Sequence, residues 1–348
     1  FSYLRNTISV RNIFIKFCTF YEYVNKNDGK VGTKTRGIDL NFNNACNLRC
    51  KYCFTNSPKG DHVKEYLDIG AIRKLADEAD ELGYFEFDLQ GGELLLQPKK
   101  LFKVLEAIKP ERFYLYLTTN GYYLDESMAK RLAEANVSRV SVSIDSMDEK
   151  IHDEIRGRKE SWKRAIAGLE HVKNAGMDPY LNITVGHYNA NTEHFKQLLD
   201  YSKNKRYKTL LNVAVPSGIW QNAEDIICDD KDREYLRKIR KEYKNLVRNI
   251  WNPFDRNHEK ILGCTTVNRV YVTPIGIAQP KCSKEKSRHP AICGVETVPW
   301  TAHISFCRMI CPLICLLKLK SKDTRFRHDA DGQASARQII LFHVELQD

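Results

Sequence analysis

The chain has 348 residues, of which 42% are hydrophobic, and carries 55 basic and 44 acidic residues for a net charge of +11. This length and apolar content are sufficient for one large hydrophobic core. No run of about 18 apolar residues occurs, which argues against a transmembrane helix. The eleven cysteines are too few for a disulfide scaffold, so they predict metal or thiol chemistry in a reducing cytoplasm.

The positive charge does not by itself indicate a nucleic-acid partner. Lysine and arginine are interspersed with acidic residues along stretches of helical period, such as residues 231–248. Such a pattern is typical of a solvated helix face. We therefore do not predict nucleic-acid binding.

The predicted elements alternate along the chain. Residues 1–36 mix apolar and basic side chains and are predicted to form an extension that packs on the core. The predicted strands are residues 37–42, 84–89, 113–118, 140–144, 180–185 and 209–215. The predicted helices are residues 68–82, 99–108, 126–135, 162–175 and 193–203. This alternation indicates right-handed βαβ units and a parallel sheet, either doubly wound or curled into a partial barrel.

Residues suited to chemistry follow each of the first four predicted strands. A cysteine-containing loop follows the first strand, and the motifs QGGE, TNG and IDS follow the next three. In both candidate folds the active site gathers at the carboxyl ends of the strands. The motifs are therefore predicted to lie together at one end of the sheet.

The loop after the first strand, NACNLRCKYCF at residues 44–54, places Cys46, Cys50 and Cys53 at the spacing C-x3-C-x2-C. Thiolates bind zinc or iron–sulfur clusters, and structural sites of both kinds usually have four protein ligands. Three ligands leave one coordination position open, which is typical of a metal centre that reacts or binds substrate. A zinc site completed by a distant residue is the alternative that the spacing leaves open.

The cysteine spacing, with Tyr52 directly before the last cysteine, resembles the cluster loop of the radical S-adenosylmethionine (radical SAM) superfamily. The resemblance implies a partial (β/α)6 TIM-like barrel with a C-terminal cysteine-containing auxiliary region. It also implies that the three cysteines hold a [4Fe–4S] cluster whose fourth iron is chelated by S-adenosylmethionine. A low-potential electron donor of the flavodoxin or ferredoxin type would then drive cleavage to methionine and a 5′-deoxyadenosyl radical.

The resemblance extends to the motifs after the other strands. It implies that the following residues contact S-adenosylmethionine: Tyr52, Gly91, Gly92, Glu93, Asn120, Ser143, Asp145 and Arg156. In the family, the GGE element receives the amino group of the cofactor, and a glycine pair allows close backbone approach. Ser143 and Asp145 would face its ribose and carboxylate, and Arg156 would pair with that carboxylate through its bidentate fork. Tyr52 would contact the adenine.

The later part of the chain resembles the family less closely. Residues 221–262 are predicted to form a helical linker with a charged helix at about residues 231–249. Cys264 and Cys282 then flank a short predicted strand, and this arrangement resembles the opening of a SPASM or twitch extension, which implies an auxiliary iron–sulfur cluster. The predicted division is an extension (1–36), a radical SAM core (37–220), the linker and an auxiliary region (263–348).

The predicted activity is hydrogen abstraction from a peptide or small-molecule substrate, whose identity the barrel motifs do not encode. Two alternatives remain. One is the GTP cyclase branch of the same superfamily, which serves molybdenum-cofactor synthesis. The other is a non-catalytic zinc-binding interaction protein on the same scaffold.

Overall fold

The computed structural model describes residues 7–26, 35–53, 55–57, 67–214, 218–220, 223, 225–243, 246–251, 269–273, 277–280 and 298–299. The proposed auxiliary ligands Cys264 and Cys282 lie outside these residues. The auxiliary cluster and the division of the chain into four parts therefore stay predictions.

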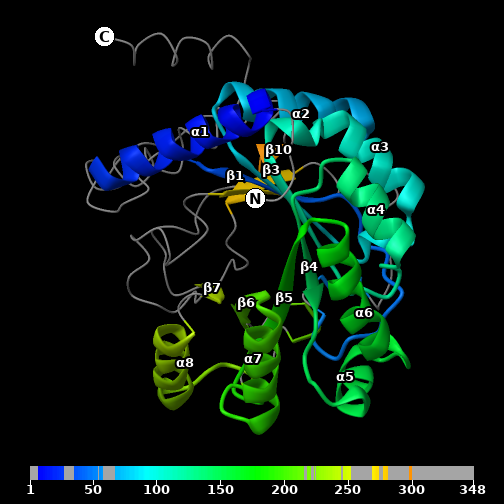
Figure 1. The fold of residues 1–348 in the computed structure, drawn as a ribbon, viewed down its shortest axis with the longest axis vertical. Coiled ribbons are helices and arrows are strands. Elements are labelled where there is room, and N and C mark those ends of the chain that lie inside the picture. Colours follow the sequence, from blue (N-terminus) through cyan, green and yellow to red (C-terminus); the bar gives the residue numbers. More distant parts are fainter. Residues whose placement is uncertain are drawn as a thin grey trace, which may run out of the picture.

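The described strands form one curled sheet (Figure 1). In chain order they are β1 (Gly37–Asn41), β2 (Glu86–Gln90), β3 (Tyr114–Thr119), β4 (Arg139–Ser143), β5 (Asp178–Val185), β6 (Lys208–Val213), β7 (Val247–Trp251), β8 (Arg269–Val272), β9 (Ile277–Pro280) and β10 (Val298–Pro299). The order across the sheet is β10-β9-β8-β1-β2-β3-β4-β5-β6-β7, with β8 parallel to β1 and the last two strands antiparallel. Because β7 and β10 lie at opposite edges, the barrel is open, and the predicted partial TIM-like barrel is confirmed.

Helices connect the parallel strands and cover the outer side of the sheet (Figure 1). They are α1 (Thr7–Lys26), α2 (Ile69–Glu81), α3 (Pro98–Ile108), α4 (Glu126–Glu134), α5 (Glu149–Arg156), α6 (Ser161–Asn174), α7 (Glu193–Lys205) and α8 (Asp230–Glu242), with 3₁₀ turns η2 (Leu94–Leu96), η3 (Pro110–Arg112) and η4 (Gly218–Trp220). Several helices begin at a side-chain N-cap that accepts a backbone N–H bond: Asp68, Asp125, Asp148, Thr192 and Asp229. The caps at Asp68, Asp125, Thr192 and Asp229 agree with the predicted helix starts, whereas the helix that Asp148 caps was not predicted.

Successive side chains of each strand point to opposite faces of the sheet, and apolar and polar residues alternate accordingly. On the outer face, apolar side chains are fully buried against the helices, as in Leu40, Leu89, Leu117 and Val142. The intervening residues of the same strands point to the inner face and are mostly polar: Asp39, Asn41, Asp88, Gln90, Tyr116, Thr118, Ser141, Ser143, Asn182, Thr184 and Asn212. The inner face of the half-barrel is therefore a polar surface rather than a second hydrophobic core.

The helix predicted at about residues 231–249 is shorter in the structure. Helix α8 ends at Glu242, and Val247–Trp251 forms β7, which pairs in parallel with β6. The prediction was wrong at its C-terminal end because the open edge of β6 offers backbone partners, and sheet pairing overrides the local helical pattern. The short strand predicted near Arg269 exists as β8, and it extends the barrel sheet beside β1.

Helix α1 packs across the amino ends of the first strands. Phe20 and Val24 bury their side chains against Phe85, which directly precedes β2. Lys16 forms an ion pair with Asp80 at the end of α2. No helix in the described part of the chain is long and apolar enough to cross a membrane.

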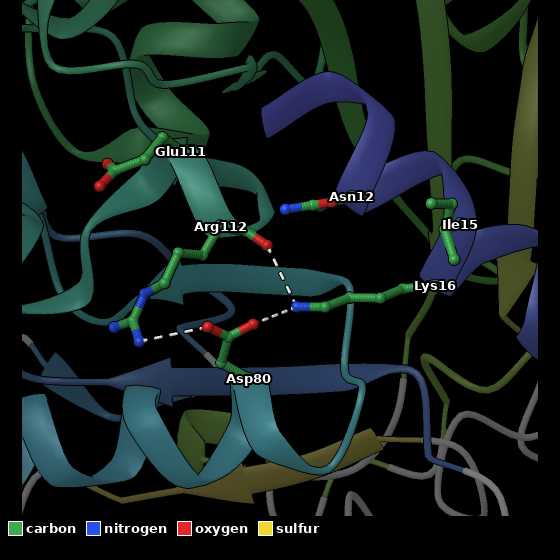
Figure 2. A pocket seen from close by; sticks show the side chains of 6 residues that line it. All are labelled: Asn12, Ile15, Lys16, Asp80, Glu111 and Arg112. Atoms are coloured by element: carbon green, nitrogen blue, oxygen red, sulfur yellow. Dashed lines mark hydrogen bonds and ion pairs between the residues drawn. The ribbon is translucent and has the colours of Figure 1, made fainter. Parts of the chain in front are cut away.

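A pocket of about 280 Å³ lies beside α1, as Figure 2 shows. Its lining includes Lys16, whose ammonium also donates to the Arg112 carbonyl, and Arg112, whose guanidinium donates to Asp77 and Asp80. Both cations of the pocket are thus already paired with carboxylates. The pocket lies where α2 and η3 lead into β2 and β3, at the end of the sheet opposite the cysteine loop, and it is not the candidate site.

Candidate functional site

The cysteine loop leaves the carboxyl end of β1, and its three cysteines are half-buried. The backbone N–H of Leu48 donates to Cys46 Sγ at 3.4 Å, and that of Ser57 donates to Cys53 Sγ at 3.2 Å. Backbone donors of this kind stabilise the negative charge that thiolate ligands carry in metal centres. The loop therefore has the backbone environment of a thiolate site.

The described residues contain one further group of candidate metal ligands. The ligand atoms of His187, Asp229 and Asp232 lie within 4.8 Å of one another, and the His187 ring contacts the Asp232 carboxylate at 2.7 Å. This group does not include the cysteines.

The protonation of the cysteines depends on a bound metal. Burial raises the pKa of Cys46 to about 12 and also raises the pKa of Cys50, although Arg156 opposes the latter shift. Metal ligation displaces such protons, because the thiolate is the ligand. The donor set therefore fits an iron–sulfur cluster, which would supply the positive charge that these thiolates need.

The GGE element holds one side of the cysteine loop through its backbone. Gly92 N–H donates to Asn43 O at 3.0 Å, and Glu93 N–H donates to Ala45 O at 2.7 Å. A Cβ atom on Gly92 would lie 2.2 Å from Ala45 O, so no larger residue fits there without moving the loop. The glycine is thus required by contact with the cluster loop.

The C-terminus of α5 holds the other side of the loop. Arg49 and Lys51 donate their backbone N–H groups to the carbonyls of Arg156 (3.0 Å) and Ile155 (2.9 Å). These carbonyls belong to the last turn of the helix and have no helical partner of their own. Gly157 ends α5 with φ +67°, and a Cβ atom there would lie 2.6 Å from Arg49 O. The cysteine loop is therefore held between the GGE element and α5.

The Glu93 carboxylate is fully buried and bound by protein donors. One oxygen accepts from Leu95 N at 2.9 Å and Thr119 Oγ1 at 2.7 Å, and the other accepts from Asn120 N at 2.8 Å. Burial raises the pKa of Glu93, and these hydrogen bonds oppose the shift. The carboxylate thus joins the ends of β2 and β3, and its predicted contact with the cofactor amino group stays a prediction.

Asn120 also contributes to the position of the loop. Its side-chain Nδ2 donates to Asn47 Oδ1 at 2.9 Å, and its Oδ1 accepts from Tyr122 N at 2.9 Å. Asn47 lies between the first two cysteines, so the TNG motif contacts the cluster loop directly. The sequence carries no signal for this role of Asn47.

Arg156 connects Asp145 to the cysteine loop. Its Nε donates to Asp145 Oδ2 at 2.5 Å, and its Nη1 donates to Cys50 Sγ at 3.7 Å. Both charged side chains are buried. The sequence predicts that each contacts the cofactor, and the structure brings the two together beside Cys50, where the guanidinium charge favours a thiolate.

His152 lies beneath this pair and is fully buried. Its Nδ1 accepts the backbone N–H of Asp145 at 3.2 Å, which requires the unprotonated ring. Burial lowers the pKa of His152 to about 4; the Asp145 carboxylate opposes this shift and the Arg156 charge adds to it. Helix α5 therefore supplies a neutral histidine that positions Asp145.

Tyr52 lies in an aromatic cluster over the loop. Its ring centroid is 4.9 Å from that of Trp220 and 6.3 Å from that of Tyr188, and the Arg156 guanidinium lies 5.6 Å from the ring. Ile219 N–H donates to Cys53 O at 3.1 Å, which joins η4 to the loop. Tyr188 and Trp220 come from segments far away in the sequence, so local patterns could not identify them.

Ser143 begins a line of polar side chains across the carboxyl ends of three strands. Asn182 Nδ2 donates to Ser143 Oγ at 3.3 Å, and Asn212 Nδ2 donates to Asn182 Oδ1 at 2.5 Å. The three residues come from β4, β5 and β6 and share the inner face. Every predicted site residue within the described chain therefore lies at the carboxyl end of the barrel strands.

Comparison with known proteins identifies the domain. Residues 40–202 match the family model described as the Radical SAM superfamily, and this segment contains the cysteine loop and the motifs that surround it. These residues form a radical SAM domain. Proteins with this domain are enzymes whose cofactors are a [4Fe–4S] cluster and S-adenosylmethionine, in agreement with the three-cysteine loop.

Curated relatives of the radical SAM domain are GTP 3′,8-cyclases. The enzyme of Nautilia profundicola is 34% identical over 182 residues, which is 51% of this chain and 55% of the relative. A probable GTP 3′,8-cyclase of Methanosarcina mazei is 26% identical over 267 residues, which is 72% of this chain and 78% of the relative. The chain spans about half the length of the first curated relatives it matches.

Solved structures support the fold of the domain. The Streptococcus suis protein SuiB bound to S-adenosylmethionine superposes with a TM-score of 0.59 at 14% identity, covering 91% of this chain and 81% of that protein. The protein anSMEcpe with bound AdoMet superposes with a TM-score of 0.54 at 22% identity, covering 71% and 74%. At such identities the similarity establishes the fold alone.

The contact between Gly92 and the cysteine loop can be tested by Gly92→Ala. The added methyl group would collide with Ala45 O, so the loop must shift and should lose roughly half or more of its iron after anaerobic reconstitution. Iron and sulfide analysis measures this. The matched control is Gly70→Ala on α2, whose Cβ would meet only the Asp68 side chain at 3.0 Å. Full iron content in a folded Gly92→Ala protein would contradict the role of this contact.

The buried neutral state of His152 predicts a pH dependence of stability. Because its pKa falls from 6.5 to about 4 on folding, its contribution is complete above pH 6.5 and is lost as the pH falls toward 4. The free energy of unfolding should fall by on the order of 2 kcal/mol between about pH 7.5 and pH 5. Urea denaturation at several pH values measures it.

The variant His152→Gln serves as the comparison for this pH dependence. Other groups with shifted pKa values, such as Asp153 and His187, are common to both proteins. The wild-type protein should therefore lose more stability over this interval than the variant. If the free energy of unfolding changed equally with pH in both proteins, His152 would not be buried in its neutral form.

Proposed function

We propose that this chain is a radical SAM enzyme that abstracts a hydrogen atom from its substrate. Cys46, Cys50 and Cys53 would hold a [4Fe–4S] cluster, which would supply one electron for cleavage of S-adenosylmethionine to methionine and a 5′-deoxyadenosyl radical; this radical would take a hydrogen atom from substrate to give 5′-deoxyadenosine. The observation that carries the proposal is the three-cysteine loop, held at the carboxyl end of the barrel by GGE on one side and α5 on the other.

The residues around the loop would bind the cofactor in complementary ways. Gly91 and Gly92 pack against Asn43 and Ala45 of the loop, so the cofactor would meet the backbone of the GGE element beside the cysteines. Arg156 lies next to Cys50 and suits a carboxylate, while the Asp145 beside it suits ribose hydroxyls or an ammonium. The Tyr52 ring offers an aromatic face for adenine. Ser143 and Asn182 supply further polar contacts from the inner face.

The partners follow from the chemistry. Cleavage needs one electron at low potential, and we propose a donor of the flavodoxin or ferredoxin type in the reducing cytoplasm. An auxiliary iron–sulfur cluster held by Cys264 and Cys282 is part of the same proposal. Both cysteines lie outside the described residues, so iron content is the relevant observation.

The variant Cys50→Ala tests the proposed function. Removing one of three ligands should reduce the yield of 5′-deoxyadenosine from S-adenosylmethionine and dithionite by roughly a hundredfold or more, because the cluster loses a covalent ligand. Chromatography of the products measures it. The matched control is Cys18→Ala, since Cys18 is exposed on α1 and distant from the loop in the fold.

Two outcomes would overturn the proposal. Undiminished 5′-deoxyadenosine production by Cys50→Ala would exclude the assigned ligand set. Tightly bound zinc without iron or sulfide in the anaerobically reconstituted protein would instead support the non-catalytic zinc-binding alternative. Neither result depends on the identity of the substrate.

A second candidate is a GTP cyclase activity, and the curated relatives favour it. It predicts that the reconstituted protein consumes GTP, with formation of 5′-deoxyadenosine, only when S-adenosylmethionine and reductant are both present. ATP under the same conditions is the control nucleotide. If GTP remains intact while S-adenosylmethionine is cleaved, the radical SAM proposal stands and the substrate belongs to another class, such as a peptide.

A further inference from the structure

Arg139 is an unusual residue on the inner face of the half-barrel. It is the first residue of β4, where Val140 and Val142 point into the outer core, so Arg139 points inward. Its Nε is buried and has no hydrogen-bond partner among the described residues. Buried guanidinium groups normally donate to carboxylates or carbonyls, so this one calls for an explanation.

Two tyrosine rings hold the Arg139 guanidinium in place. Its Cζ lies 3.6 Å from the ring centroid of Tyr116 on β3 and 4.5 Å from that of Tyr180 on β5. Stacking on ring faces fixes the plane of the guanidinium and leaves its edge, with the N–H groups, for another partner. The rings therefore orient the side chain, while its Nε donates to none of the described residues.

Arg269, on the same face, has the hydrogen-bond partners that are typical of a structural arginine. Its guanidinium donates to Asp39 at 2.5 Å, to Ile38 O at 3.1 Å and to Glu86. These contacts join β8 to β1 and β2, and the side chain is almost fully buried. Within the described part of the chain Arg139 has no such set of carboxylate bonds, although both arginines lie near Tyr116.

A second donor lies on the same line. Ser141 follows Arg139 on the inner face, about 7 Å nearer the carboxyl end of β4. It is fully buried, and its hydroxyl has no hydrogen-bond partner among the described residues. Along β4, which ends at Ser143, Arg139 Nε and the Ser141 hydroxyl are thus two successive inward donors without a hydrogen-bond partner in the described part of the chain.

The electrostatic surroundings keep the Arg139 charge in place. Burial lowers the pKa of Arg139, but Tyr116, Tyr114 and Asp88 raise it by more, so the group stays cationic. Two acidic residues flank the site on this face: Asp88 on β2 pairs with Tyr116 in the strand register, and the exposed Asp178 on β5 pairs with Arg139 itself. The Tyr114 hydroxyl donates to Asp178 at 3.3 Å. An anionic ligand of Arg139 must therefore avoid both carboxylates.

We propose that Arg139, with Ser141 as the next donor, binds an oxyanion group of the substrate, a carboxylate or a phosphate, inside the half-barrel below the cluster. This inference rests on the proposed function and adds the chemical class of the substrate. An oxyanion matches the planar fork of arginine through two parallel hydrogen bonds. Thr118 and Tyr180 beside the site are half-buried, so this part of the inner face is open to a ligand.

Binding to the reconstituted protein tests the inference with two kinds of probe. GTP and inorganic tripolyphosphate represent the phosphate source, and an acetylated, amidated Ala-Glu-Ala peptide represents the carboxylate source, with Ala-Gln-Ala as its neutral control. Isothermal titration measures each dissociation constant. At least one probe should bind, and Arg139→Gln should weaken it roughly ten- to hundredfold, with Arg139→Lys in between because it keeps the charge but not the fork.

The matched control is Arg131→Gln on α4, where an arginine stacks on Phe102 at 4.2 Å on the outside of the barrel. Thermal unfolding establishes that each variant is folded. Equal affinity of folded Arg139→Gln and wild-type protein for every probe, or no affinity of the wild type for any probe, would overturn the inference. The readout does not require S-adenosylmethionine cleavage, so loss of binding and loss of the proposed radical activity are separate results.

Discussion

The cysteine loop keeps its shape because the backbone of two neighbouring segments contacts it from both sides. The GGE element donates N–H groups to the loop on the β2 side, and the last carbonyls of α5 accept N–H groups from it on the other. Both contacts are so close that glycine is required, at Gly92 and at Gly157. A loop held by backbone can vary its side chains, and this leaves the three sulfur atoms and the adjacent Arg156 to determine the chemistry.

A chain of buried polar contacts runs from Cys50 to His152. Arg156 places a guanidinium against Cys50, Asp145 holds Arg156, and the neutral ring of His152 holds the backbone of Asp145. These contacts depend on burial, which strengthens the ion pair of Arg156 with Asp145 and keeps His152 unprotonated. Glu93 performs a comparable task between β2 and β3, since its carboxylate accepts three hydrogen bonds from the protein. The residues of the predicted motifs thus form hydrogen bonds and ion pairs with other groups of the protein.

The open half-barrel provides a polar inner face for a substrate. Outward residues of the strands form one core with the helices, and several inward residues form hydrogen bonds with one another. Arg269 and Asp39 join β8 to β1, whereas Arg139 Nε and the Ser141 hydroxyl have no hydrogen-bond partner among the described residues. On the inner face, we therefore assign a structural role to Arg269 and a ligand-binding role to Arg139.

The sequence by itself determined the alternation of strands and helices, the parallel sheet and the end of the sheet at which the motifs gather. These follow from local periodicity, helix caps and the rule that parallel strands share a carboxyl end. The three cysteines of one short loop were also readable, because their grouping depends on no distant residue, and their role as cluster ligands stays a prediction. The tertiary structure alone decided that β7 replaces the end of a predicted helix, since the edge of β6 was available for pairing. It also decided that Glu93 and Asp145 bind protein donors, that Tyr188 and Trp220 join Tyr52, and that Arg139 lies between two tyrosine rings. Such contacts join strands and loops that are distant in the chain, and no local pattern records which side chains meet when the sheet curls.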